Sequence, residues 1–232
     1  YRIAHMLIAS GLTVAFLIAG ISAYRLLRGD RRNDVQVALR TGIVMAALLI
    51  PTQILIGDMH GLNTLHHQPA KIAAIEGVWT RESGAPLLLF ALPNAETKSN
   101  DYALGVPKLA SLILTHDING ELPGLDEFPA GHAPVAPVFW SFRIMVGVGM
   151  LMLAVAWGWA FLLWRRQTPR WALRGLVAMT FSGWFATVAG WYVTEVGRQP
   201  WLVTGVLLTK DAASTVPAQA IFGSLTMYLL LY

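Results

Sequence analysis

The chain has 232 residues, of which 55% are hydrophobic and only 13% are charged. A soluble domain of this length ordinarily carries about 25% charged residues, so the composition indicates a membrane protein. The formal net charge is +4, but the arginines fall in short loops between apolar runs, which excludes a nucleic-acid surface. The chain has no cysteine, which excludes disulfides, thiolate-bound metals, iron–sulfur clusters and covalently attached haem.

Several apolar runs are long enough to cross a bilayer, which takes about 20 residues of helix. The candidate spans are residues 3–27, 36–57, 138–164, 172–194 and 216–232. The sequence therefore predicts an all-α fold, a polytopic transmembrane helix bundle. Tyr1 is not an initiator residue, and the last run ends without a flanking charge, so we expect an internal fragment of a longer polytopic protein.

The second and third runs are separated by a long polar stretch that holds five of the six histidines and eight of the twelve prolines. We therefore expect three regions. These are residues 1–57 with helices one and two, 58–137 as a long extracytoplasmic loop, and 138–232 with helices three to five, the last one truncated.

Arginines set the expected orientation. One cluster follows the first span and another joins the third and fourth: Arg25, Arg28, Arg31, Arg32, Arg165, Arg166, Arg170 and Arg174. Two spans separate the clusters, so both clusters share one side, which the positive-inside rule makes cytoplasmic. The 58–137 stretch and the 195–215 loop then face outward.

This topology places three possible iron ligands near the outer face. His5 lies near the outer end of span one, Met145 about two turns inside span three, and Glu195 at the end of span four. Histidine with methionine is an axial pair of low-spin haem, whereas a carboxylate leaves the iron high-spin with an open side. The alternatives are a hydrogen-bonded interfacial histidine and a methionine that fills a packing gap.

Charged residues and a tryptophan accompany these candidates. Arg143, two residues before Met145, needs an anionic partner in the membrane, and haem propionates are one choice. Glu195 either ligates iron or pairs with Arg198 at helix spacing. Trp191 shares a helix face with Glu195, either as an aromatic-belt residue or as a ring between cofactors.

The outer segment offers a different chemistry. Asp58 and three histidines invite a zinc interpretation, but their spacing fits no compact metal motif. Residues 71–76 predict a short amphipathic helix at the surface. Either it is an ordinary solvated helix, or it recognises a lipid-soluble quinol, with Glu76 accepting protons as electrons leave and Lys71 tuning it.

Three motifs occur in order: Gln68-Pro-Ala-Lys-Ile-Ala-Ala-Ile-Glu76, Phe142-Arg-Ile-Met-Val146 and Gly197-Arg-Gln-Pro-Trp201. Together with the opening His5 helix and its Gly20-Ile-Ser-Ala23, they make the chain resemble subunit I of cytochrome bd quinol oxidase. The resemblance covers nearly the whole chain.

The resemblance implies specific roles. The low-spin haem b would be held by His5 and Met145 with Arg143 beside it, and the high-spin haem b by Glu195, with Arg198 close to the haems. Trp191 would lie between haems and carry electrons. Lys71 and Glu76 would belong to the quinol-oxidising Q-loop, and the third haem would be haem d or a further haem b.

The resemblance also implies a terminal oxidase that transfers electrons from membrane quinol to oxygen and reduces it to water. We expect a multi-pass protein of the bacterial cytoplasmic (inner) membrane, with lipid, an oxidase subunit II and a small single-helix subunit as partners and no nucleic acid. Lys71 and Met145 are 74 positions apart, similar to the short Q-loop branch that includes cyanide-insensitive oxidases.

Two other functions remain open at this point. One is a di-haem cytochrome b subunit of another quinol reductase, although such proteins use paired histidines and the predicted spans contain one. The other is a non-haem membrane transporter, in which Glu195, Arg198 and Arg143 would be gating or substrate charges. The resemblance further implies four helices before His5, so this chain would hold only part of the oxygen-reducing site.

Overall fold

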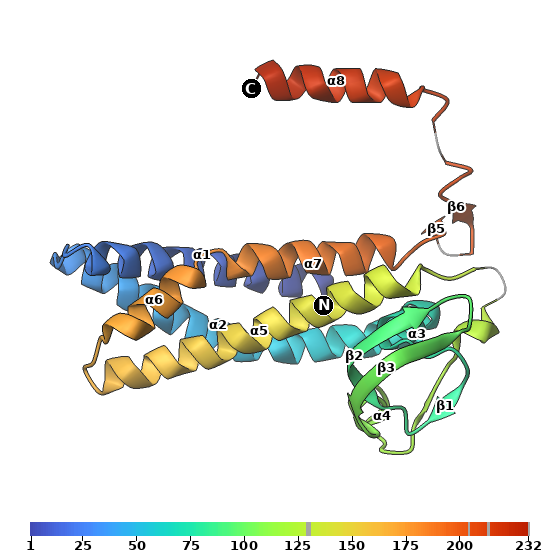
Figure 1. Ribbon diagram of the computed structural model, residues 1–232, viewed down its shortest axis with the longest axis horizontal. Helices are drawn as coiled ribbons and strands as arrows, with labels where there is room; N and C mark the ends of the chain where they lie inside the picture. Colours follow the sequence, from blue (N-terminus) through green and yellow to red (C-terminus); the bar gives the residue numbers. More distant parts are fainter. Residues whose placement is uncertain (129–130, 204, 213, 232) are drawn as a thin grey trace.

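The computed structural model describes residues 1–128, 131–203, 205–212 and 214–231. Long helices form most of it (Figure 1). They are α1 (Arg2–Leu27), α2 (Asn33–His67), α5 (Val135–Trp164), α6 (Arg170–Ala178), α7 (Ser182–Val196) and α8 (Ala218–Leu231).

Four helical segments are long and apolar enough to cross a membrane: Arg2–Leu27, Asn33–His67, Val135–Trp164 and Arg170–Val196. The last is α6 followed by α7, interrupted by a turn at 179–181. The predicted helical membrane bundle is therefore confirmed. The fifth predicted run forms α8, which has 14 described residues.

The four spans pack so that α1 and α5 lie diagonally opposite, each in contact with both α2 and α7. Close approach of α1 and α2 depends on a small residue. A Cβ atom at Gly42 would lie only 2.7 Å from the carbonyl oxygen of Ala15, so a larger side chain there would force the helices apart. Buried side chains between the helices, such as Phe16, Ile50 and Met152, fill the interior.

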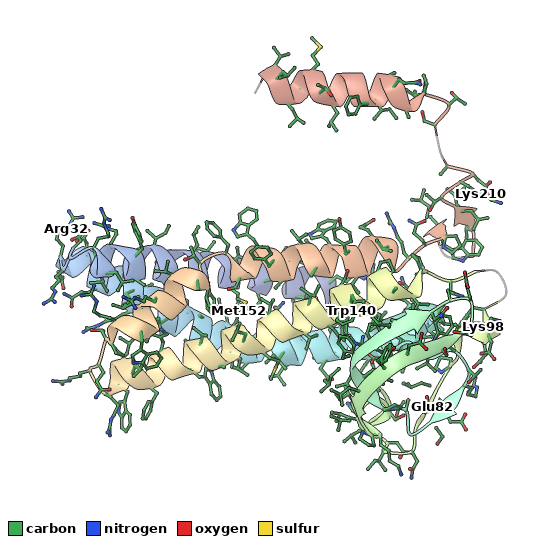
Figure 2. All side chains as sticks on the ribbon, in the orientation of Figure 1. Arg32, Glu82, Lys98, Trp140, Met152 and Lys210 are labelled. Carbon is green, nitrogen blue, oxygen red and sulfur yellow. The ribbon has the colours of Figure 1, made fainter. Side chains whose placement is uncertain are left out.

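Both arginine clusters lie at one end of the bundle, as the topology prediction requires. The α1–α2 connection with Arg32 is at the left of Figure 2, and the segments carrying Glu82, Lys98 and Lys210 are at the right. The right-hand end is the one that the positive-inside rule places outside.

The predicted end of the second span is wrong as a helix boundary. We expected the helix to stop at residue 57, but α2 continues without a break to His67. A polar residue can end a membrane span without ending a helix, because the backbone hydrogen bonds continue. Gln68 N still bonds to Thr64 O, and the Thr64 hydroxyl bonds to His60 O.

The outer segment is a small folded layer and not an extended loop. Its elements are α3 (Pro69–Glu76), β1 (Glu82–Ser83), β2 (Leu87–Asn94), β3 (Ser99–Val106), α4 (Leu109–Thr115), β4 (Glu121–Leu122) and the 3-10 helix η1 (Leu125–Glu127). β2 and β3 form an antiparallel hairpin, and β1 pairs with β4. After α7, β5 (Trp201–Val203) and β6 (Leu207–Leu208) form a further hairpin.

Helix α3 is buried, which corrects the expectation of an amphipathic surface helix. Every residue from Lys71 to Glu76 is buried, because α3 contacts α2, α5 and η1. Ile72 and Ile75 join a hydrophobic cluster with Val138 of α5 and Val193 of α7. The outer layer is thus fixed to the ends of the membrane helices.

Candidate functional site

His5 and Met145 lie towards the outer end of two opposite helices, α1 and α5. Ile8 of α1 and Val148 of α5 pack against the same hydrophobic cluster in the bundle interior. His5 and Met145 each lie three residues closer to the outer end than these neighbours, which is about one turn of helix. Both predicted ligands therefore lie on the outer side of this interior cluster.

The surroundings of both side chains fit an axially ligated haem. His5 Nδ1 is buried without a hydrogen-bond partner, and its Nε2 lies 3.1 Å from Gln53 Nε2. Glycines face both side chains: a Cβ atom at Gly57 would lie 3.3 Å from His5 Cε1, and one at Gly190 would lie 3.0 Å from Met145 Sδ. An imidazole and a thioether form a suitable donor set for low-spin haem.

Arg143 joins α5 to the outer layer. Its Nη2 lies 3.2 Å from Glu76 Oε2, with both side chains at most 10% exposed. Its Nε donates to Leu88 O at 2.7 Å, and its Nη1 donates to Ile75 O at 2.5 Å. The anion that Arg143 requires is Glu76 in this structure, whereas the sequence suggested haem propionates.

Glu76 is held in this pair on the α5 side of α3. Burial raises the pKa of the Glu76 carboxyl, while the charge and hydrogen bond of Arg143 lower it, and the rise is the larger effect. Removal of Arg143 would leave the buried Glu76 carboxylate without a compensating charge, which is strongly destabilising.

Glu195, Arg198 and Trp191 lie at the outer end of α7. Glu195 Oε2 is 2.5 Å from Arg198 Nη2, and both side chains are about two-fifths exposed. Trp191 is 51% exposed on the same helix face as Glu195. Glu195 is about 7 Å nearer the outer end than Gly190, and therefore than Met145, at 1.5 Å per residue. The three predicted ligands share an end of the bundle but not one depth.

Lys71 brings the Glu195 run and the outer layer together. Its Nζ donates to Thr194 O at 3.5 Å, and a Cβ atom at Gly197 would lie 3.3 Å from the Lys71 stem. The pKa of Lys71 is lowered from 10.5 to about 8, mainly by burial, while Arg2 and Arg198 also lower it and Glu195 raises it. The amine is therefore partly neutral near physiological pH.

The shifted pKa predicts a pH-dependent stability. Between about pH 8 and 10.5 the unfolded chain holds a proton that folded Lys71 has lost, so the free energy of unfolding should rise with pH in that window. In the full-length protein, the Tm of Lys71→Met minus the Tm of wild type should therefore decrease from about pH 7.5 to about pH 9.5. The matched variant Lys98→Met, at the exposed hairpin tip, should show no such trend, and an equal trend would contradict the prediction.

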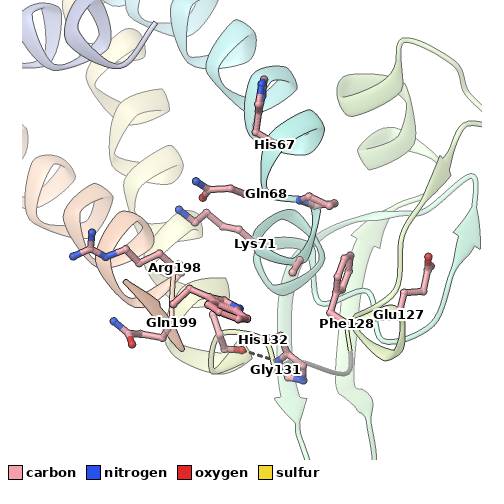
Figure 3. Close-up of a pocket in the computed structure, with 14 residues that line it drawn as sticks. His67, Gln68, Lys71, Glu127, Phe128, Gly131, His132, Arg198 and Gln199 are labelled. Atoms are coloured by element: carbon pink, nitrogen blue, oxygen red, sulfur yellow. Dashed lines mark hydrogen bonds between the residues drawn. The ribbon is translucent and has the colours of Figure 1, made fainter. Parts of the chain in front are cut away.

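A pocket of about 270 Å³ opens beside Lys71. Figure 3 shows side chains from three parts of the chain around it. They are Gln68 and Lys71 at the start of α3, Phe128 and His132 before α5, and Arg198 and Gln199 after α7. Glu76 does not line it. The pocket combines apolar walls with a few converging polar groups, as small-molecule sites do.

Comparison with known families decides what these motifs belong to. All of residues 1–232 match the sequence profile described as cytochrome bd terminal oxidase subunit I. The chain belongs to this family. The predicted resemblance is thereby confirmed over the whole chain.

Individual relatives agree with this assignment. The chain is 30% identical to cytochrome bd ubiquinol oxidase subunit 1 of Bacillus subtilis, over 98% of this chain and 52% of that protein. It is 29% identical to cytochrome bd-II ubiquinol oxidase subunit 1 of Escherichia coli, over 100% and 58%. The solved bd oxidase from Geobacillus thermodenitrificans superposes with a TM-score of 0.88 at 32% identity, over 100% of this chain and 54% of that chain. The chain thus spans about half the length of these family members.

The structure adds pocket residues that the sequence analysis did not single out. Gln68 was noted only as the first residue of a motif, and Phe128 and His132 were not considered. Phe128 and His132 lie about 60 positions after Lys71 in a segment with no distinctive pattern, so only the fold of this subunit I chain brings them to the same pocket.

Proposed function

We propose that this chain forms the quinol-oxidising and haem-holding part of a membrane quinol:oxygen oxidoreductase. One observation carries the proposal: the three family motifs, far apart in sequence, meet at the outer end of the bundle. Glu76 of the first pairs with Arg143 of the second, and Lys71 of the first packs on Gly197 of the third.

His5 and Met145 would hold a low-spin haem b, with Arg143 fixing the helix that carries Met145. Glu195 would hold a high-spin haem b, with Arg198 and Trp191 on its exposed side, where a third haem of d or b type would complete the site. Bound there, haem would supply one-electron transfer from quinol towards oxygen. The exposure of Glu195 and Trp191 supports a site shared with a further part of the protein.

Lys71 and Glu76 would serve the quinol site. Lys71 lines the pocket and would exchange a proton near its pKa of about 8, because its charged form is desolvated. Glu76 would position α3 through Arg143. Protons released at this end would leave on the extracytoplasmic side, since the arginine clusters occupy the other end.

The names of the relatives, each numbered as subunit 1, support a partner subunit. We propose a multi-pass protein of the bacterial cytoplasmic membrane that works with an oxidase subunit II, a small single-helix subunit and surrounding lipid. The compact outer layer between α3 and α5 supports the short Q-loop branch. Family membership gives no support to the alternative di-haem reductase or transporter.

The decisive experiment is the visible spectrum of the full-length protein. Dithionite-reduced minus oxidised spectra should contain low-spin haem b bands, and carbon monoxide should shift only a high-spin component. A preparation with low-spin bands but no response to carbon monoxide would contradict the oxidase. A folded protein without haem bands would contradict haem binding altogether.

A further inference from the structure

Two residues that line the pocket beside Lys71 carry buried polar atoms that nothing in the described part of the chain satisfies. Gln68 Oε1 and Arg198 Nε belong to residues that line it, and neither atom has a hydrogen-bond partner. Buried polar atoms in native proteins are nearly always paired. Unpaired ones at a pocket therefore point to a ligand that carries its own hydroxyl or carbonyl groups.

His132 lines the same pocket, and one hydrogen bond fixes which of its nitrogens carries the proton. Its Nδ1 lies 2.9 Å from the carbonyl oxygen of Ala133. A carbonyl oxygen can only accept, so Nδ1 is the donor and Nε2 of the neutral ring keeps a free lone pair. Such a nitrogen can accept a hydrogen bond from a hydroxyl group and then its proton.

The remaining lining suits an aromatic ring. Phe128 and Trp201 contribute aromatic surface, and Pro69, Ala70 and Ala133 contribute small apolar surface. Glu76 is absent from the lining because its carboxylate is held by Arg143.

Four side chains of the lining could take a proton from a ligand. Glu127 is paired with Arg81, and His67 is exposed at the end of α2. Lys71 of α3 and the half-buried His132 before α5 approach the pocket from different elements (Figure 3).

Resting on the proposed quinol oxidation, we propose that His132 is a catalytic residue of this pocket. The quinol ring lies against the apolar lining, with one hydroxyl group donating to His132 Nε2 and the other donating to Gln68 Oε1 beside Lys71.

Oxidation of the quinol in this pocket releases two electrons and two protons. Both O–H bonds of the quinol break and both C–O bonds become carbonyls. The two electrons leave one at a time to ferric haem, the oxidant of the proposed function. One proton forms the Nε2–H bond of His132, which returns it to water on the extracytoplasmic side. The other forms an N–H bond on the neutral amine of Lys71, which releases it to the same side.

The test uses the full-length enzyme with His132→Gln and His132→Leu. Glutamine keeps an acceptor oxygen but takes no proton, so kcat with quinol should fall about 100-fold while KM changes by less than about threefold. Leucine should also weaken equilibrium binding of a hydroxyquinoline quinol analogue about tenfold, because it leaves a hydroxyl group unpaired. Oxidation of an artificial donor, tetramethylphenylenediamine, and the reduced haem spectrum should stay unchanged in both.

The matched control is His116→Gln. His116 is an exposed histidine of the same outer layer that does not line the pocket, and this variant should behave as wild type throughout. Unchanged kcat and analogue binding in both His132 variants would overturn the inference, as would a parallel loss of the haem spectrum. A wild-type enzyme that oxidises the artificial donor but not quinol would overturn the proposed function instead.

Discussion

Replacing Arg143 by leucine should lower the stability of the protein by about 3–5 kcal/mol, because the change leaves the carboxylate of Glu76 buried without its partner. It also removes the donors to Ile75 O and Leu88 O, so α3 and β2 each lose a hydrogen bond to α5. Oxidation of quinol should fall much further than oxidation of an artificial donor, since the pocket lies beside α3. Thermal unfolding and the two oxidase assays on the full-length enzyme measure these effects.

Arg81→Leu is the matched control for this variant. Arg81 also pairs with two glutamates, Glu121 and Glu127, but its side chain is 55% exposed. Exposed pairs contribute about 0–1 kcal/mol, so Arg81→Leu should be nearly neutral. The double variant Arg143→Leu/Glu76→Leu should recover part of the lost stability, because it leaves no unpaired charge. Equal Tm values for Arg143→Leu and Arg81→Leu would contradict the role given to the buried pair.

Replacing Met145 by leucine should abolish the low-spin reduced haem b band while the protein remains folded. Leucine has nearly the volume of methionine, so packing against Gly190 should cost less than about 1.5 kcal/mol. Leucine has no sulfur to ligate iron, and a haem with one axial ligand becomes high-spin. The reduced minus oxidised spectrum of the full-length enzyme measures the change, and near-native Tm shows that folding is intact.

Met150→Leu provides the comparison on the same helix. Met150 is 52% exposed on the outside of α5, so its replacement should leave every haem band unchanged. A normal low-spin spectrum in Met145→Leu would rule out Met145 as the ligand and make it a packing residue. Loss of the band in both variants would point to a general disturbance of α5.

The membrane helices could be predicted because a span is a local property of the sequence. A run of about 20 apolar residues has few alternatives to a transmembrane helix. The orientation could be predicted because the arginine clusters are also local features of the sequence. The end of α2 was missed because polarity was used as a signal for helix termination, although Asp58 and His60 continue the helix without a break in its hydrogen bonds.

The site depends on contacts between distant residues, which no local pattern contains. Glu76 and Arg143 could be selected individually as unusual charges, but their pairing follows from the way α3 packs against α5. The burial of α3 was missed because Lys71 and Glu76 are the only polar residues of this short helix. Two polar positions are too few to show that every face of the helix is covered. No sequence pattern pointed to His132 before the fold placed it at the same pocket as Lys71.

The β2–β3 hairpin has a consequence for how proteins of this kind can diverge. Its turn, residues 95–98, is exposed, and Asn94 Oδ1 accepts from the backbone N–H groups of Glu96 and Thr97. The opposite end, where Leu87 pairs with Val106, carries the contact to Arg143 through Leu88. Extra residues at an exposed turn cost little, since loop-closure entropy grows slowly with length. This turn is therefore a place where the chain can acquire insertions while the pocket and the helices beneath it keep their shape.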